Sequence, residues 1–133
     1  MIRAVADTHA VIWYLFDIPR LSARASSIFS EAEERGDQIA VSSISFVEII
    51  YLMEKKRIHA ATFERLANEL QRPKAVLVEV FVDLQVSRTM ASVSRTAVPD
   101  MPDRIIAATA LHLGVPLISR DRRIQLSEVE TVW

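Results

Sequence analysis

The sequence predicts an α/β fold in which a central parallel sheet of about five strands is covered by helices on both faces. Short apolar runs typical of buried strands alternate with longer segments of helical periodicity along all 133 residues. Half of the residues are apolar, which is enough for one substantial core. No linker or repeat divides the chain, so we expect a single domain over residues 1–133.

The first two strands and helices follow one another closely. Residues 2–6 are an apolar strand, and residues 8–16 have a helical pattern. A serine is placed to cap a helix over residues 22–35, and Gly36 provides its stop signal. Residues 39–42 are a second short strand.

The middle of the chain contains the most apolar helix. Ser45 opens it, and "FVEIIYLMEKK" continues it to residue 56. An amphipathic helix over residues 62–71 follows and ends before Pro73. Residues 76–82 are rich in valine and predict a third strand.

The last third repeats the alternation. An aspartate is placed to cap a helix over residues 84–94, and a helix over residues 102–113 is followed by a glycine. We then expect a strand at residues 115–119, a helical turn at residues 122–126 and a last strand at residues 129–133.

Composition excludes several functional classes. There are no cysteines, so disulfides, thiolate metal sites and cysteine nucleophiles are absent, as is common in the cytoplasm, where we expect the protein. We expect no membrane association, because no signal peptide is visible and the apolar runs are too short to cross a bilayer. Two glycines cannot build a P-loop or a dinucleotide-binding turn. A net charge of −1 means that any nucleic-acid binding needs a local basic patch.

Two carboxylates stand at the ends of predicted strands. Asp7 directly follows the first strand, and Asp121 follows "VPLIS" with one residue between. The carboxyl ends of parallel strands meet at one edge of a sheet, where ligands bind. A carboxylate between buried segments is costly unless it is compensated. For Asp121 the alternative is a helix N-cap for "RRIQL".

Two further acids lie in first turns of helices. Residues 44–53 are apolar nearly all round, which predicts a buried helix whose Glu48 points into protein or a cleft. The alternative for Glu48 is a capping box with Ser45. Asp103 begins a small apolar face, although a place in the first turn, with Asp100 as N-cap, explains both aspartates structurally.

That apolar face of residues 102–113 has its own members. We assign to it Ile106, Ala107 and Ala110, and to a different side of the helix Arg104, Ala108 and His112.

The charge repulsion among four carboxylates at one edge must be relieved, because a like-charge pair at about 5 Å costs roughly 3 kcal/mol at an effective dielectric of about 20. Oxygen-only donors select hard cations such as Mg²⁺ or Mn²⁺.

At these residues the sequence resembles the PIN-domain ribonucleases, specifically the VapC-type toxins of toxin–antitoxin pairs. The segments that carry the resemblance run through the chain in family order: "ADTHAVIWYL", "VSSISFVEI", "PDMPDRIIAATAL", "LISRDRRI" and the terminal "VETVW". The resemblance implies a single PIN domain, a three-layer sandwich with strand order 3-2-1-4-5.

The resemblance also implies site roles. The acidic triad would be Asp7, Glu48 and Asp103, with Asp121 as the fourth acid. Thr8 and Ser119 match supporting hydroxyl positions, and Asp100 matches an acid before the third motif that we do not expect to bind metal directly. His9 follows a variant of the first motif and is expected at the rim or in a structural role, since hard metals prefer oxygen.

The implied reaction is hydrolysis of RNA phosphodiester bonds with one or two Mg²⁺ or Mn²⁺ ions, leaving a 5′ phosphate. Single-stranded or loop RNA suits a recessed site. We expect phosphate contacts from Arg120, Arg122 and Arg123. A second basic cluster, residues 55–57, is explained by its place at a helix end, and the aromatic residues of segment 13–16 by core or dimer packing.

The implied partners are a second copy of the chain and a small antitoxin that covers the active-site groove and so relieves inhibition of translation or growth. The helices at residues 44–53 and 62–71 are our candidates for these contacts, because they offer more apolar surface than a small domain buries easily. The alternative function is a catalytically weak or inactive PIN-like module that binds RNA or protein. A receiver domain would need an acidic pair where Asp7 stands alone, and an Asp-x-Asp phosphatase would need an acid where His9 stands.

Overall fold

The computed structural model describes residues 1–125 and 127–133 and contains one five-stranded sheet of parallel strands in the order β3-β2-β1-β4-β5. The strands are β1 (Ile2–Ala6), β2 (Gln38–Ser42), β3 (Leu77–Val80), β4 (Leu117–Ile118) and β5 (Thr131–Val132). The helices are α1 (Thr8–Leu15), α2 (Ala23–Arg35), α3 (Ser43–Glu54), α4 (Thr62–Gln71), α5 (Leu84–Met90), α6 (Met101–Leu113) and α7 (Arg122–Gln125). The predicted fold class and strand order are confirmed.

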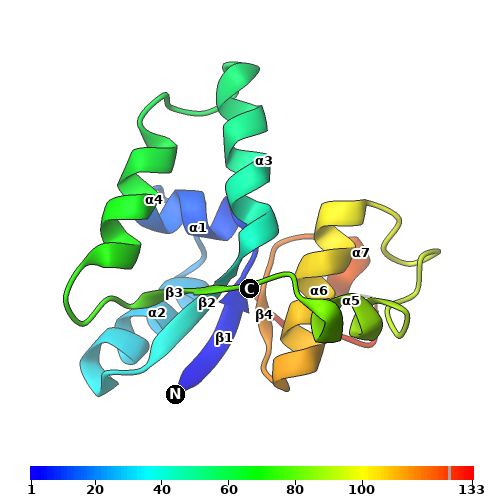
Figure 1. The fold of residues 1–133 in the computed structure, drawn as a ribbon. Coiled ribbons are helices and arrows are strands. Elements are labelled where there is room, and N and C mark those ends of the chain that lie inside the picture. The colour runs from blue at the N-terminus through cyan, green and yellow to red at the C-terminus, as the bar shows by residue number, and fades with distance from the viewer. Residues whose placement is uncertain (126) are drawn as a thin grey trace.

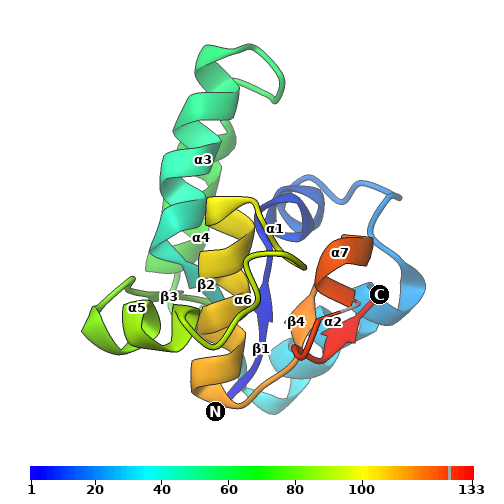
Figure 2. The ribbon, with the colours of Figure 1, turned by 90° about the vertical axis from the view of Figure 1, so that its right-hand side faces the viewer.

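Helices cover both faces of the sheet, which makes three layers (Figure 1). One core, built around Val11, Phe29 and Leu66, joins α1, α2, α3 and α4 to their face of the sheet. A second core, built around Val86 and Ile106, joins α5, α6 and α7 to the other face, which Figure 2 views from the side of α6. Burial on both faces explains why the strands are apolar without alternation.

Several element ends differ from the prediction because local caps decide them. Ser42 caps α3, and its hydroxyl accepts from the Ile44 amide at 3.3 Å, so the helix begins at Ser43. The Ser45–Glu48 capping box therefore does not form. Helix α5 ends at Met90 rather than residue 94, and β3, β4 and β5 are shorter than their apolar runs. The predicted turn at 122–126 includes Leu126, which lies outside the described residues.

The surroundings of two helices also differ from the prediction. Of α3, only Ser45 and Ile49 are buried, so it is not enclosed by the chain as its composition predicted. It pairs with α4 in a hairpin that rises away from the sheet (Figure 1). On α6 the residues from Ile105 to Ala110 are all buried, so Ala108, placed on the other side by periodicity, belongs to the core. Within the described ranges no helix is both long and apolar enough to cross a bilayer.

Candidate active site

The acids singled out in the sequence line one cavity of about 560 Å³ at the carboxyl edge of the sheet. Its acidic residues are Asp7, Glu48, Asp100, Asp103 and Asp121. Its other lining residues are Thr8, His9, Trp13, Arg20 and Arg120. The structure thus brings together segments from the whole chain, because β1, β4 and the starts of α3 and α6 meet at this edge.

Asp7 is held at the junction of β1, β4 and α1. Its main-chain amide donates to the Ile118 carbonyl at 3.1 Å, which fixes the end of β1 beside β4. Its Oδ1 caps α1 by accepting from the Ala10 amide at 2.9 Å. Burial raises the pKa of the Asp7 carboxyl, and hydrogen bonds from Ser119 and Ala10 offset part of that rise.

Glu48 is oriented by a chain of hydroxyl groups. Thr8 donates through Oγ1 to Glu48 Oε1 at 2.5 Å, and the same oxygen lies 2.9 Å from the buried Ser45 Oγ. Since a threonine hydroxyl has one proton, Ser45 must be the donor to Thr8 when Thr8 donates to Glu48. Burial raises the pKa of Glu48, the Thr8 hydrogen bond lowers it, and Asp100 raises it further.

The pKa of Asp103 is also strongly raised. Its pKa rises from 3.8 to about 7, first because of burial and then because Asp100, Asp121, Glu48 and Asp7 all repel its charge. Within the described residues, no hydrogen bond is donated to its carboxylate. This carboxyl therefore holds a proton more readily than an ordinary aspartic acid does.

Asp100 acts as the predicted cap of α6, and Asp121 accepts a main-chain hydrogen bond at the start of α7, which was the structural alternative for this residue. Asp100 Oδ2 accepts from the Asp103 amide at 3.0 Å at the start of α6. Asp121 Oδ1 accepts from the Arg123 amide at 2.8 Å, and the buried Ser119 Oγ accepts from the Asp121 amide at 3.1 Å. Ser119 thus anchors the main chain of Asp121, and both Asp100 and Asp121 still line the acidic cavity.

The arginines that line the cavity are not the three that the sequence predicted. Of the three predicted phosphate contacts, only Arg120 lines the cavity, whereas Arg122 and Arg123 are exposed on α7 outside its lining. Arg20, which the sequence analysis missed, also lines it. Arg20 follows α1 in an irregular turn, so no sequence periodicity could have placed it.

His9 and Trp13 form the aromatic part of the lining. They lie four residues apart on α1, with ring centroids 5.7 Å apart. His9 is exposed at the rim, as expected, while Trp13 is only 9% exposed and packs in the core as well as lining the cavity. The four-residue spacing of His9 and Trp13 was the sequence feature that could have predicted this aromatic part of the lining.

The donors are chemically suited to a hard cation, since the cavity offers carboxylate and hydroxyl oxygens. In the described part of the chain, however, no three histidine, aspartate or glutamate side chains are already close enough to hold a metal ion together. The acids line the same cavity, but their carboxylates are not grouped around one point. A cation would have to draw them together.

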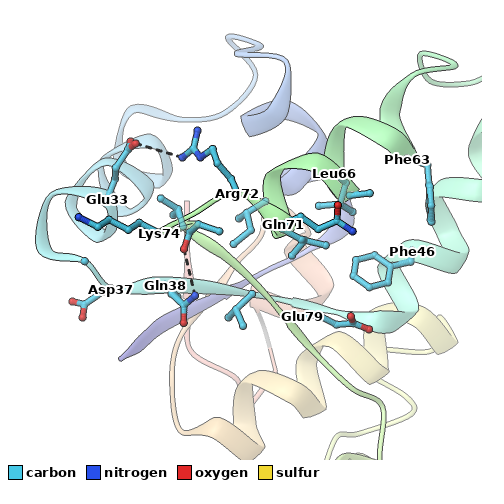
Figure 3. A pocket seen from close by; sticks show the side chains of 17 residues that line it. Glu33, Asp37, Gln38, Phe46, Phe63, Leu66, Gln71, Arg72, Lys74 and Glu79 are labelled. Atoms are coloured by element: carbon cyan, nitrogen blue, oxygen red, sulfur yellow. Dashed lines mark hydrogen bonds and ion pairs between the residues drawn. The ribbon is translucent and has the colours of Figure 1, made fainter.

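A larger hollow, with a volume of about 770 Å³, lies between α4 and the edge strand β3 (Figure 3). Its apolar lining includes Phe46, Phe63 and Leu66. Among its charged lining residues, Glu33 pairs with Arg72 at 3.7 Å and Asp37 pairs with Arg3 at 3.3 Å. Its shape suits an apolar partner, whereas the smaller acidic cavity has the groups that chemistry requires.

The chain is similar to known proteins over nearly its whole length. Residues 4–130 match the family model described as PIN domain. The chain is 31% identical over 125 residues to Ribonuclease VapC22 of Mycobacterium tuberculosis, an alignment that covers 94% of this chain and 92% of that protein.

Two solved structures share the fold. One is the VapBC2 complex of Rickettsia felis bound to a DNA fragment from its promoter, with a TM-score of 0.73, 16% identity and coverage of 99% of this chain and 98% of that chain. The other is a toxin–antitoxin complex from Klebsiella pneumoniae, with a TM-score of 0.65, 21% identity and coverage of 98% and 96%. At these identities the likeness concerns the fold.

Proposed function

The chain belongs to the PIN-domain family, and we propose that it is a ribonuclease acting as the toxin of a toxin–antitoxin pair. The observation that carries the proposal is the acidic cavity, in which five carboxylates from four segments of the chain meet at the carboxyl edge of the sheet. The similarity to a ribonuclease over nearly the whole chain supports the same reaction. Hydrolysis of RNA would slow translation and growth.

Mg²⁺ or Mn²⁺, as one or two ions, would be held by Asp7, Glu48, Asp103 and Asp121. Such an ion supplies an activated water and neutralises charge on the scissile phosphate. The raised pKa of Asp103 supports this assignment. Burial is its largest cause, and the repulsion from the other acids, which adds to it, is what a cation would relieve.

The remaining groups of the cavity serve the acids and the RNA. Thr8 holds Glu48 in place, and Ser119 holds the main chain of Asp121. Asp100 fixes the start of α6 and so the position of Asp103. Arg120 is the RNA-phosphate contact that lines the cavity; Arg122 and Arg123 would reach only more distant phosphates.

A second copy of the chain is the proposed partner of α3. The outer face of α3 exposes apolar side chains, with Val47 63% and Tyr51 55% exposed. The segment after β3 continues this surface, because Ser43 Oγ accepts from the Val82 amide at 3.0 Å and Phe81 is 66% exposed. An apolar strip of this kind on a small domain favours a symmetric homodimer.

The antitoxin is the proposed occupant of the hollow beside α4 (Figure 3). The expected contact helix at residues 62–71 is α4, and its apolar residues Phe63, Leu66 and Leu70 line that hollow. Engagement there would anchor a segment that extends toward the acidic cavity. The resemblance of the fold to subunits of toxin–antitoxin complexes supports such a partner.

The test is cleavage of labelled single-stranded RNA by the purified chain, in chelator and after addition of Mn²⁺ or Mg²⁺. We expect cleavage only with the metal, and a rise in Tm on Mn²⁺ addition. Full activity in chelator would refute the metal mechanism. The separation of the acids favours the alternative of a binding module without catalysis; that alternative predicts RNA binding with neither a Tm response nor cleavage.

A further inference from the structure

The lining of the acidic cavity also includes two arginines and two aromatic residues. Arg20, from the turn after α1, and Arg120, directly after Ser119, line the same cavity as the five acids. Among the described residues, neither guanidinium lies within 4.0 Å of a carboxylate oxygen. Two cations therefore border five acids without being neutralised by an ion pair, and their donors remain available to another anion.

Arg120 is held in position by Trp13. The carbon at the centre of its guanidinium lies 5.4 Å from the centroid of the Trp13 ring, within the range of a cation–π contact. Trp13 is itself fixed, because the ring of Trp133 packs edge-on against it at 5.6 Å and the tilted ring of His9 lies 5.7 Å away. A guanidinium that stacks on a ring keeps its in-plane N–H groups free, which suits bidentate binding of a phosphate.

The ring of Trp13 is poorly placed to stack on an RNA base. Only 9% of the residue is exposed, and Arg120 lies over its face. Its function at the cavity is thus better explained through Arg120 than through direct contact with the nucleic acid.

Resting on the proposed ribonuclease function, we propose that Arg20 and Arg120 bind the RNA phosphates at the mouth of the acidic cavity, and that Trp13 is a positioning residue for Arg120. The chain has a net charge of −1 and its site is acidic, so RNA needs a local cationic surface to approach it. Arg20 and Arg120 supply that surface directly beside the acids.

The test measures binding of a short, labelled, mixed-sequence single-stranded RNA in the Asp103→Asn background, where the probe stays intact. Fluorescence anisotropy gives Kd between about 50 and 200 mM salt, and each phosphate contact contributes about 0.7 to the slope of log Kd against log salt. We expect Arg20→Gln and Arg120→Gln each to lower this slope by about 0.7. Arg35→Gln is the matched control, because it removes the same charge from the end of α2, at the opposite edge of the sheet.

The positioning role of Trp13 is tested by a double-mutant cycle with Arg120. Trp13→Leu should lower the slope as Arg120→Gln does, and the double variant should lose no more than either single variant, whereas Trp13→Phe should retain binding. Circular dichroism and Tm identify a Trp13→Leu chain that does not fold, in which case the two arginine variants decide the proposal.

The results distinguish a failure of this inference from a failure of the proposed function. If the parent chain binds RNA and Arg20→Gln and Arg120→Gln match Arg35→Gln, this inference is wrong while the proposed function stands. Additive losses from Trp13→Leu and Arg120→Gln would refute the positioning role of Trp13. If the wild-type chain neither binds nor cuts RNA, the proposed function fails and the inference fails with it.

Discussion

Replacing Asp103 with Asn should stabilise the metal-free protein while removing its metal-dependent cleavage. The carboxyl has a pKa of about 7 in the folded chain against 3.8 as the ordinary value. Ionised Asp103 therefore destabilises the fold: the stability present below about pH 4 is lost as the pH rises through about 7. Asn keeps the size of the side chain and cannot ionise.

The magnitude follows from the size of this pKa difference. About three pH units at 1.36 kcal/mol each would give roughly 4 kcal/mol. Asp103 keeps partial access to solvent, which screens the repulsion, so we expect a gain of about 1–2 kcal/mol at pH 8. For a chain of 133 residues this is roughly 3–10 °C in Tm.

The assay is thermal unfolding of both chains from pH 4 to pH 8 in chelator, repeated with Mn²⁺, beside RNA cleavage. The difference in Tm should be small at pH 4, grow with pH and shrink when Mn²⁺ stabilises the wild type alone. Asp100→Ala is the matched control: loss of its cap should cost about 1 kcal/mol and leave much of the cleavage rate. A Tm difference independent of pH, or loss of cleavage in Asp100→Ala but not in Asp103→Asn, would refute this reasoning.

Three further predictions concern single side chains. Asp7→Asn should abolish cleavage and growth inhibition in expressing cells with little change in Tm, because Asn also caps helices well; unchanged toxicity would make Asp7 structural. Thr8→Val should raise the pKa of Glu48 by removing its hydrogen bond, moving the acid limb of the cleavage pH profile upward, and Thr8→Ser should not. Val47→Glu should convert a dimer to a monomer in light scattering while Tm stays nearly constant, and a dimer that persists would place the interface elsewhere.

The fold was predictable because the strands are buried on both faces and so appear as apolar runs separated by caps. The same reasoning failed for α3, since an apolar composition does not by itself require burial within the chain. Val47 and Tyr51 are as apolar or aromatic as core residues but are exposed in this single chain. The prediction for Ala108 was wrong for a related reason. A helix that packs on more than one side has no polar side, so periodicity cannot assign Ala108 to one.

The acids of the site were predictable and their basic neighbours were not. Asp7 and Asp121 follow strands, and Glu48 and Asp103 lie in the first two turns of their helices, so the topology alone brings them to one edge. Arg20 depends on the path of an irregular turn. Arg122 and Arg123 were assigned by proximity in sequence to Asp121, but they lie on a helical turn outside the cavity lining.

The structural and functional interpretations of these acids are compatible. Asp7, Asp100 and Asp121 each accept a main-chain hydrogen bond through one oxygen, which fixes the side chain as a cap, and each also lines the acidic cavity. Such a cap lowers the entropy lost when the other oxygen binds a ligand. Asp103 has no such bond among the described residues and has a pKa of about 7. It is therefore an acid whose charge depends on what enters the cavity, and one through which a bound cation would change stability.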